Sequence, residues 1–135
     1  MKEPALAELS DEELVERIVQ LATEMSKCEL TQHYDRLTFK MGDARKTLHA
    51  RGSEAVKKLL PFLDHPIPRV RQIAAVICYD EAQDCNRVLR TLRTQKNPNT
   101  SIEALLFLLD HDHEHAKEFS EDMNRRYGNQ SDPPP

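Results

Sequence analysis

The sequence predicts an all-α fold, and three observations lead to this prediction. Leu, Ala, Glu, Lys and Arg, the residues that favour helices, dominate the composition. Glycine is scarce, with 3 residues in 135, and aromatic residues make up 5%, whereas a β-sandwich or barrel needs turn glycines and β-branched and aromatic runs. Apolar residues recur at spacings of three and four, the period of an amphipathic helix. We expect about six helices in antiparallel hairpins.

The length of 135 residues is that of one ordinary domain. We assign this domain to residues 1–128 and expect residues 129–135, which end in three prolines, to be a disordered tail. The formal net charge of −4 argues against a dedicated nucleic-acid binder. No apolar run is long enough to span a membrane, no secretory signal is visible, and the three cysteines form no CxxC pair. These features predict a cytoplasmic protein.

The first helix is predicted to begin at Ser10, whose hydroxyl forms a capping box with Glu13. A second amphipathic segment follows, and Gly52 suits its C-terminal cap. No Gly or Pro marks a break near residues 27–31, so residues 11–51 form either two helices or one long helix. Their heptad-like apolar stripes pair either within the chain or across a homodimer. The stripe of the first helix consists of Leu14, Ile18, Leu21, Met25 and Cys28.

The third and fourth helices are predicted on either side of a proline-rich turn. Ser53 is the expected N-cap of a short third helix, which Pro61 bends or stops near its end. The turn covers residues 64–68. Pro68 fits the first position of the fourth helix, where its missing N–H costs nothing.

Two more helices are predicted in the C-terminal third of the chain. Asp84 is the expected cap of the fifth helix. Thr100 and Glu103 form a second predicted capping box, which opens a sixth helix that runs to about Tyr127, with Gly128 as its stop. The residues expected to point inward from this helix are Ile102, Leu105, Leu106, Leu109 and Phe119.

Residues 55–78 resemble a HEAT repeat. The first helix ends in Leu-Leu-Pro-Phe-Leu (59–63), and the second opens with Pro-Arg-Val-Arg (68–71), followed by a pair of small alanines. With two helices before this hairpin, the arrangement is also similar to an uncharacterised bacterial family of short HEAT-like proteins. The resemblance implies an α-α superhelix, because one repeat cannot bury its own faces. It also implies that the arginine of the Pro-x-Val-Arg motif reaches a carboxylate in the turn, here Asp64.

The segment Asp-His-Asp-His-Glu-His (110–115) is the strongest candidate for chemistry. On one helix His111 and His115 share a face, and two imidazoles there hold zinc or nickel if a third ligand comes from elsewhere. His113 points roughly opposite, and neither an HExxH motif nor a cysteine at zinc spacing accompanies the segment. A solvated helix segment or a helix break is the simpler interpretation.

Arginine and lysine side chains form the second candidate surface. In a HEAT-like stack such residues line an inner surface that binds acidic peptides or nucleic acid, whereas the simpler interpretation is a solvated helix face paired with acids. The predicted partner-binding residues are Arg69, Arg71, Arg87 and Arg90.

No nucleophile elbow or glycine-rich loop surrounds the scattered His49, His65 and Cys85, so we expect no enzyme and no cofactor. The predicted function is that of an adaptor or immunity-like protein that binds another protein through a helical surface, an inference from fold analogy. The alternatives are a metal-binding protein that uses His111 and His115 and a nucleic-acid-binding helical stack.

Overall fold

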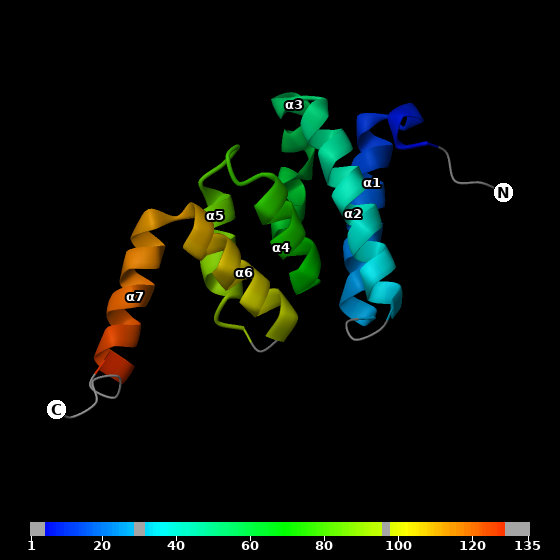
Figure 1. Cartoon of the computed structure of the whole chain (residues 1–135). Coiled ribbons are helices and arrows are strands. Elements are labelled where there is room, and N and C mark those ends of the chain that lie inside the picture. Colours follow the sequence, from blue (N-terminus) through cyan, green and yellow to red (C-terminus); the bar gives the residue numbers. More distant parts are fainter. Residues whose placement is uncertain (1–4, 29–31, 96–97, 129–135) are drawn as a thin grey trace.

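The computed structural model describes residues 5–28, 32–95 and 98–128, and these residues are almost entirely helical (Figure 1). The predicted all-α class is confirmed. The described chain holds seven α-helices, one more than the expected six, because the predicted sixth helix is two. In chain order the elements are η1 (Leu6–Glu8), α1 (Asp11–Lys27), α2 (Gln32–Ala50), α3 (Ser53–Val56), η2 (Lys57–Asp64), α4 (Pro68–Ile77), α5 (Asp84–Leu92), α6 (Pro98–His111) and α7 (His113–Tyr127), where η denotes a 3₁₀ helix.

Helix α1 begins where the sequence predicts. The Ser10 hydroxyl accepts a hydrogen bond from the Glu13 N–H at 3.1 Å, and the Glu13 carboxylate accepts one from the Ser10 N–H at 3.0 Å. This capping box satisfies two backbone donors that helix geometry leaves without a partner.

Residues 11–51 form two helices rather than one, and of the break predicted near residues 27–31 the part at 29–31 lies outside the described residues. Helices α1 and α2 pack side by side (Figure 1), and the buried apolar residues of both belong to one core. Their stripes therefore pair within the chain, and a homodimer through the same residues would have to open this pair.

The predicted third helix consists of a single α-helical turn, α3, continued by η2. Pro61 lies inside η2 and has no N–H to donate to an α-helical bond. The tighter 3₁₀ geometry is common at such positions. The expected N-cap at Ser53 is wrong, because Gly52 takes that position with a φ of 97°, and the Ser53 hydroxyl donates to the carboxylate of Glu81. A positive φ favours glycine, which has no Cβ.

Helix α4 lies at the centre of the molecule and contacts α1, η2, α5 and α6. Pro68 occupies its first turn, as predicted. The helix buries Val70, Ala74 and Ala75 together with one charged side chain, that of Arg69. Because helices pack on α4 from several sides, polar residues of this helix are enclosed as well.

The predicted capping box at Thr100 is wrong. Helix α6 begins earlier, at Pro98, so Thr100 lies inside the first turn, where it is buried. The Glu103 carboxylate does not reach back to Thr100 but accepts hydrogen bonds from Arg69 and from the Tyr34 hydroxyl. The Glu103 carboxylate therefore takes part in contacts between helices. The expected cap of the fifth helix is also displaced by one residue, since Gln83 precedes Asp84 as its N-cap.

The predicted sixth helix is interrupted at Asp112. This residue has an extended backbone, and its side chain accepts a hydrogen bond from the His115 N–H at 3.0 Å, which makes it the N-cap of α7. Helix α7 then extends away from the other helices at the far end of the molecule (Figure 1). It ends at Tyr127, as predicted, and Gly128 follows with right-handed helical φ and ψ.

The buried face of α6 differs from the predicted one. Ile102 and Leu106, both expected to point inward, are 53% and 59% exposed, whereas Ala104 and Leu108 are fully buried. Residues 104–109 read Ala-Leu-Leu-Phe-Leu-Leu, so apolar spacing does not distinguish one side from the other. Contacts with α4 and α5 decide which side is covered. Among the described helices none is both long and apolar enough to cross a membrane.

Candidate binding surfaces

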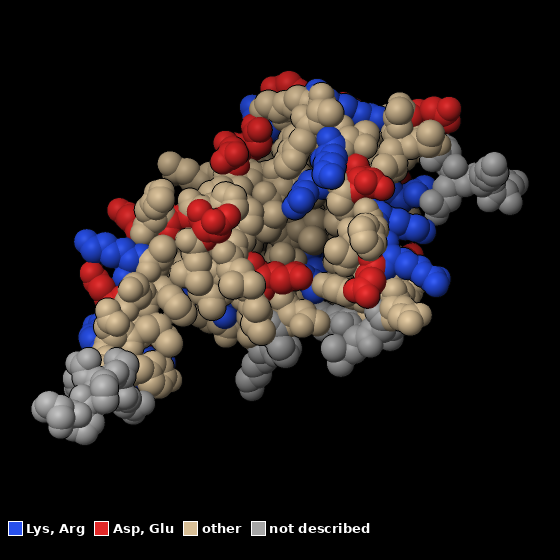
Figure 2. All heavy atoms as spheres, in the orientation of Figure 1, with Lys and Arg blue, Asp and Glu red and all other residues tan. Residues whose placement is uncertain are grey.

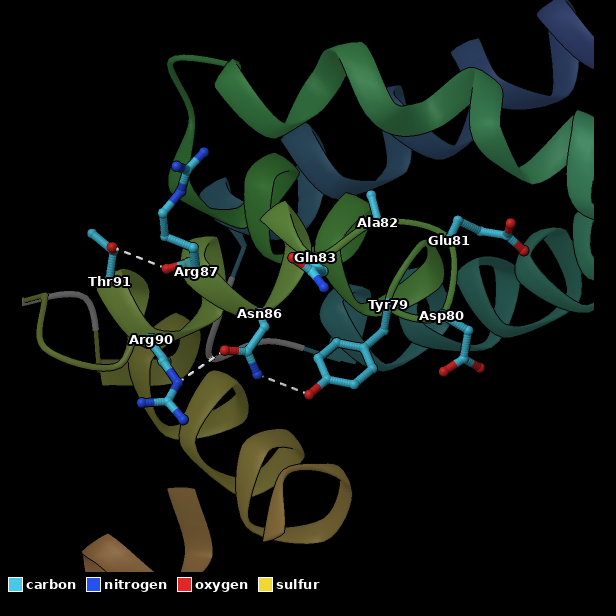
Figure 3. A pocket seen from close by; sticks show the side chains of 9 residues that line it. All are labelled: Tyr79, Asp80, Glu81, Ala82, Gln83, Asn86, Arg87, Arg90 and Thr91. Atoms are coloured by element: carbon cyan, nitrogen blue, oxygen red, sulfur yellow. Dashed lines mark hydrogen bonds between the residues drawn. The ribbon is translucent and has the colours of Figure 1, made fainter. Parts of the chain in front are cut away.

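A groove of about 800 Å³ runs along the exposed side of α5 (Figure 3). Helix α5 contributes residues that recur at helical spacing, and the connection from α4 to α5 contributes the rest. We call this hollow the α5 groove. It is lined by Tyr79, Asp80, Glu81, Ala82, Gln83, Asn86, Arg87, Arg90 and Thr91.

A polar network around Asp112 builds one part of the α5 groove. The Asn86 amide donates to the Tyr79 hydroxyl at 2.8 Å and to Asp112 at 2.7 Å, and Arg90 donates to Asp112 at 2.9 Å. Burial opposes the charged form of Asp112, but hydrogen bonds from the His115 N–H, Asn86 and Arg90 outweigh it and lower its pKa to about 2. The network therefore holds the start of α7 against α5.

The structure brings Arg87 and Arg90 together in the α5 groove and places the other predicted partner-binding arginines elsewhere. Arg87 is exposed and forms an ion pair with Asp84 at 3.1 Å. Arg90 is half-buried and committed to the Asp112 network. The predicted surface role of Arg69 is wrong, because its side chain is 0% exposed. Arg87 keeps most of its charge in solvent and also lines a smaller hollow together with Arg71, whereas Arg69 lines neither hollow.

Arg71 closes the turn before α4. Its guanidinium donates to the carbonyl oxygens of His65 at 2.7 Å and Pro66 at 3.1 Å. The HEAT resemblance implied that the carboxylate of Asp64 takes this place, but among the described contacts of Arg71 the backbone carbonyls do so.

The helix break separates the two predicted metal ligands. His111 ends α6 and is exposed, and its ring stacks on Phe107 with centroids 3.9 Å apart. His115 lies in the first turn of α7, is buried, and has a pKa lowered by burial and then by the charge of Arg93. No group of three or more His, Cys, Asp or Glu side chains in the described ranges is arranged to hold a metal ion. A site at His111 and His115 therefore lacks a third ligand there and stays a prediction.

Cys78 and Cys85 belong to the core. Burial raises the pKa of Cys78 to about 12 and that of Cys85 to about 11. The thiolate is the nucleophilic form of cysteine, so both thiols stay protonated and inert at neutral pH. Their S–H groups instead donate to backbone carbonyls. The Cys78 thiol donates to the Val56 oxygen at 3.3 Å, and the Cys85 thiol donates to the Cys78 oxygen at 3.2 Å.

A second hollow, of about 330 Å³, lies where α2, the end of α4 and the end of α6 meet. It shares Tyr79 and Asp80 with the α5 groove. The sequence interpretation did not identify it, although Arg45 and His49 stand four positions apart on one predicted helix, a spacing that places them on the same side. We call it the basic hollow, because Arg45, Lys46 and two imidazoles line it.

An apolar strip on α6 faces solvent. Ile102 and Leu106 are exposed, and Leu105 and Leu109 beside them are half-buried. We call these four residues the α6 stripe. Their spacing of three and four positions is that of a helix face built for packing. The sequence did reveal the stripe, but it did not reveal that the stripe lies outside the core.

Comparison with known proteins assigns the chain to a family but identifies no activity. No curated protein matches the chain, and no solved structure matches it. A family described as Domain of unknown function (DUF2019) matches residues 12–112. The match runs from the first turn of α1 to the break at Asp112 and covers well over half of the chain, while α7 lies beyond it. The chain therefore belongs to the DUF2019 family.

Proposed function

We propose that this chain is a protein-binding domain whose partner packs on the α6 stripe. The observation that carries the proposal is the exposure of Ile102 and Leu106, at 53% and 59%. Contiguous apolar patches on the surface of a folded protein mark interaction sites, whereas single exposed apolar residues are ordinary. An adaptor or immunity-like role needs only such a binding surface.

The order of the helices also supports the proposal, because it resembles the order in a HEAT-like stack. Three hairpins follow one another, namely α1 with α2, α3 and η2 with α4, and α5 with α6, and successive hairpins contact each other. In stacks of this kind each hairpin is covered by its neighbours. The outer face of the hairpin at an end has no such neighbour, so it is either polar or covered by a partner. The α6 stripe belongs to the last of the three hairpins and is apolar, so we propose that a partner covers it.

The alternative of nucleic-acid binding gains no support from the arginines. Arg69 is buried, and Arg87 and Arg90 are paired with carboxylates. On the face that Figure 2 shows, acidic and basic side chains are interspersed. Nucleic-acid binding depends on a concentrated basic surface.

Two charge-introducing variants test the proposal. Leu106→Asp places a carboxylate in the α6 stripe, and Phe39→Asp places one at another exposed apolar residue, on α2. Phe39 is 79% exposed, which makes it a matched control for insertion of a charge at an exposed apolar position. Neither change removes a core contact, so thermal denaturation should show a folded protein in both cases.

Affinity purification from cells of the source organism, followed by quantitative mass spectrometry, then compares the partners. We expect the same protein to be recovered with the unmodified chain and with Phe39→Asp, and to be lost with Leu106→Asp. Equal recovery with all three chains would show that the partner binds elsewhere and would overturn the proposal.

A further inference from the structure

We propose that the basic hollow binds a phosphate group carried by a small molecule. The hollow is independent of the α6 stripe, because Phe107 and His111 line it from a different side of α6 than the side that presents Ile102 and Leu106. In Figure 2 a recess lies between α2 and α6, with basic side chains at its edge.

Two permanent cations line the basic hollow without an internal partner. Arg45 and Lys46 are both exposed, and neither forms an ion pair within the described ranges of the chain. By contrast, Arg51 and Lys58 are held by the carboxylates of Asp11 and Glu12 at the start of α1, at 3.0 and 2.7 Å. Uncompensated cations that share one recess attract anions, because the surrounding protein focuses their field into it.

The two imidazoles of the hollow are oriented by backbone carbonyls. Nε2 of His49 lies 2.9 Å from the Ile77 oxygen, and Nδ1 of His111 lies 3.0 Å from the Phe107 oxygen. A carbonyl only accepts, so these nitrogens carry the proton and donate. The second nitrogen of each ring is not used by these bonds.

Among the residues that the structure describes, Asp80 is the one acidic side chain that lines the basic hollow. Its carboxylate opposes an anion, but the charges of Arg45 and Lys46 outweigh it. Removal of this single negative charge should therefore strengthen anion binding, whereas removal of either cation should weaken it. Removal of the same charge at Lys40, outside the hollow, is the comparison that distinguishes a site from a general effect of net charge.

The size and the aromatic lining of the hollow favour a small organic phosphate. A volume of about 330 Å³ is at the lower end of the range for small-molecule sites. Tyr79 packs edge-on against Phe107 with centroids 5.0 Å apart, and Phe107 stacks on His111. These rings offer an apolar surface next to the cations, where the non-phosphate part of a ligand can pack.

Isothermal titration calorimetry of the full chain with AMP, and separately with inorganic phosphate, tests the proposal. We expect saturable binding that Lys46→Gln and Arg45→Gln each weaken about tenfold or more, as loss of a charge-assisted hydrogen bond does. Asp80→Asn should tighten binding about threefold. Lys40→Gln removes the same charge from an exposed position of the same helix outside the hollow, so it should change affinity less than about twofold.

The affinities for AMP and for phosphate show which part of the ligand is recognised. Tighter binding of AMP than of phosphate supports contact with the aromatic side chains, and equal affinities support recognition of the phosphate group alone. Absence of saturable binding for both probes overturns the proposal, as do equal losses with Lys46→Gln and Lys40→Gln, because these indicate diffuse attraction. Binding confined to a phosphoserine peptide also overturns it, since the occupant is then a protein. Thermal denaturation checks that every variant is folded.

Discussion

Arg69 shows how one buried charge connects distant parts of the chain. Its guanidinium donates to Gln72 on α4, to Glu103 on α6 and to the Tyr34 hydroxyl on α2 at 2.7 Å. A buried charge requires such partners, because its removal from water costs several kcal/mol. Tyr34 precedes Arg69 by 35 positions and Glu103 follows it by 34, so no local pattern in the sequence predicts that this arginine is internal.

The dependence of Arg69 on Glu103 leads to a stability prediction. Glu103→Ala leaves a buried guanidinium without its carboxylate, and we expect the free energy of unfolding to fall by about 2 kcal/mol. Glu118→Ala is the control, because this carboxylate is 63% exposed and lies 3.5 Å from Arg90, and its loss should cost less than about 1 kcal/mol. Urea denaturation measures both. Similar losses for the two variants would contradict the role given to Glu103.

Asp112 predicts how stability responds to acid. Its pKa of about 2 in the folded chain lies below the ordinary value of 3.8, so the unfolded chain takes up the proton first. The resulting stabilisation, about 2 kcal/mol, is present above pH 4 and is lost as the pH falls from about 4 to about 2. Asp112→Asn should therefore destabilise the chain at pH 6 and match the unmodified chain more closely near pH 2. A difference that stays constant over this range, measured by urea denaturation, would exclude this contribution.

At the scale of the element, two glycines have opposite roles. Gly52 has a φ of 97° between α2 and α3, whereas Gly42 lies inside α2 with open space where a Cβ would stand. Gly52→Ala should lower the free energy of unfolding by about 1 kcal/mol or more, and Gly42→Ala should raise it by about 0.5–1 kcal/mol. Chemical denaturation of both variants measures the difference. Changes of the same sign would be inconsistent with these backbone conformations.

The capping box at the start of α1 gives a second prediction at this scale. Ser10→Ala removes the acceptor for the Glu13 N–H and should cost about 1 kcal/mol of stability. Ser120 lies exposed inside α7, so Ser120→Ala should be neutral or slightly stabilising. Thermal denaturation of the two variants provides the comparison. An unchanged melting temperature for Ser10→Ala would show that the cap contributes nothing.

The elements that local chemistry specifies were predictable, and those that packing specifies were not. The Ser10 cap and Pro68 at the first turn of α4 depend on neighbours in sequence, and both occur as predicted. The break at Asp112 was one of the interpretations that the sequence left open, since it combines a local bond from the His115 N–H with bonds from Asn86 and Arg90 on α5. The orientation of α6 depends on the helices beneath it, because residues 104–109 are apolar throughout.

At the scale of the whole molecule, the helices run from the α1–α2 pair at one side to α7 at the other (Figure 1). The basic hollow needs side chains from α2, α6 and the α4–α5 connection, which are far apart in the sequence. The sequence alone therefore identified the individual cations but did not show that they line the same hollow. The α6 stripe was visible in the sequence, yet only the arrangement of the helices shows that nothing in the described chain covers Ile102 and Leu106.

Photo-cross-linking from the α6 stripe tests the central claim most directly. A photoreactive phenylalanine analogue at position 106 reports which protein touches the stripe in living cells, and the same analogue at position 39 reports random encounters at an exposed apolar site. We expect one discrete cross-linked product from position 106 that is absent from position 39. The mass of the product distinguishes a second copy of this chain from a different protein. The same products from both positions, or none from position 106, would contradict a protein-binding role for the α6 stripe.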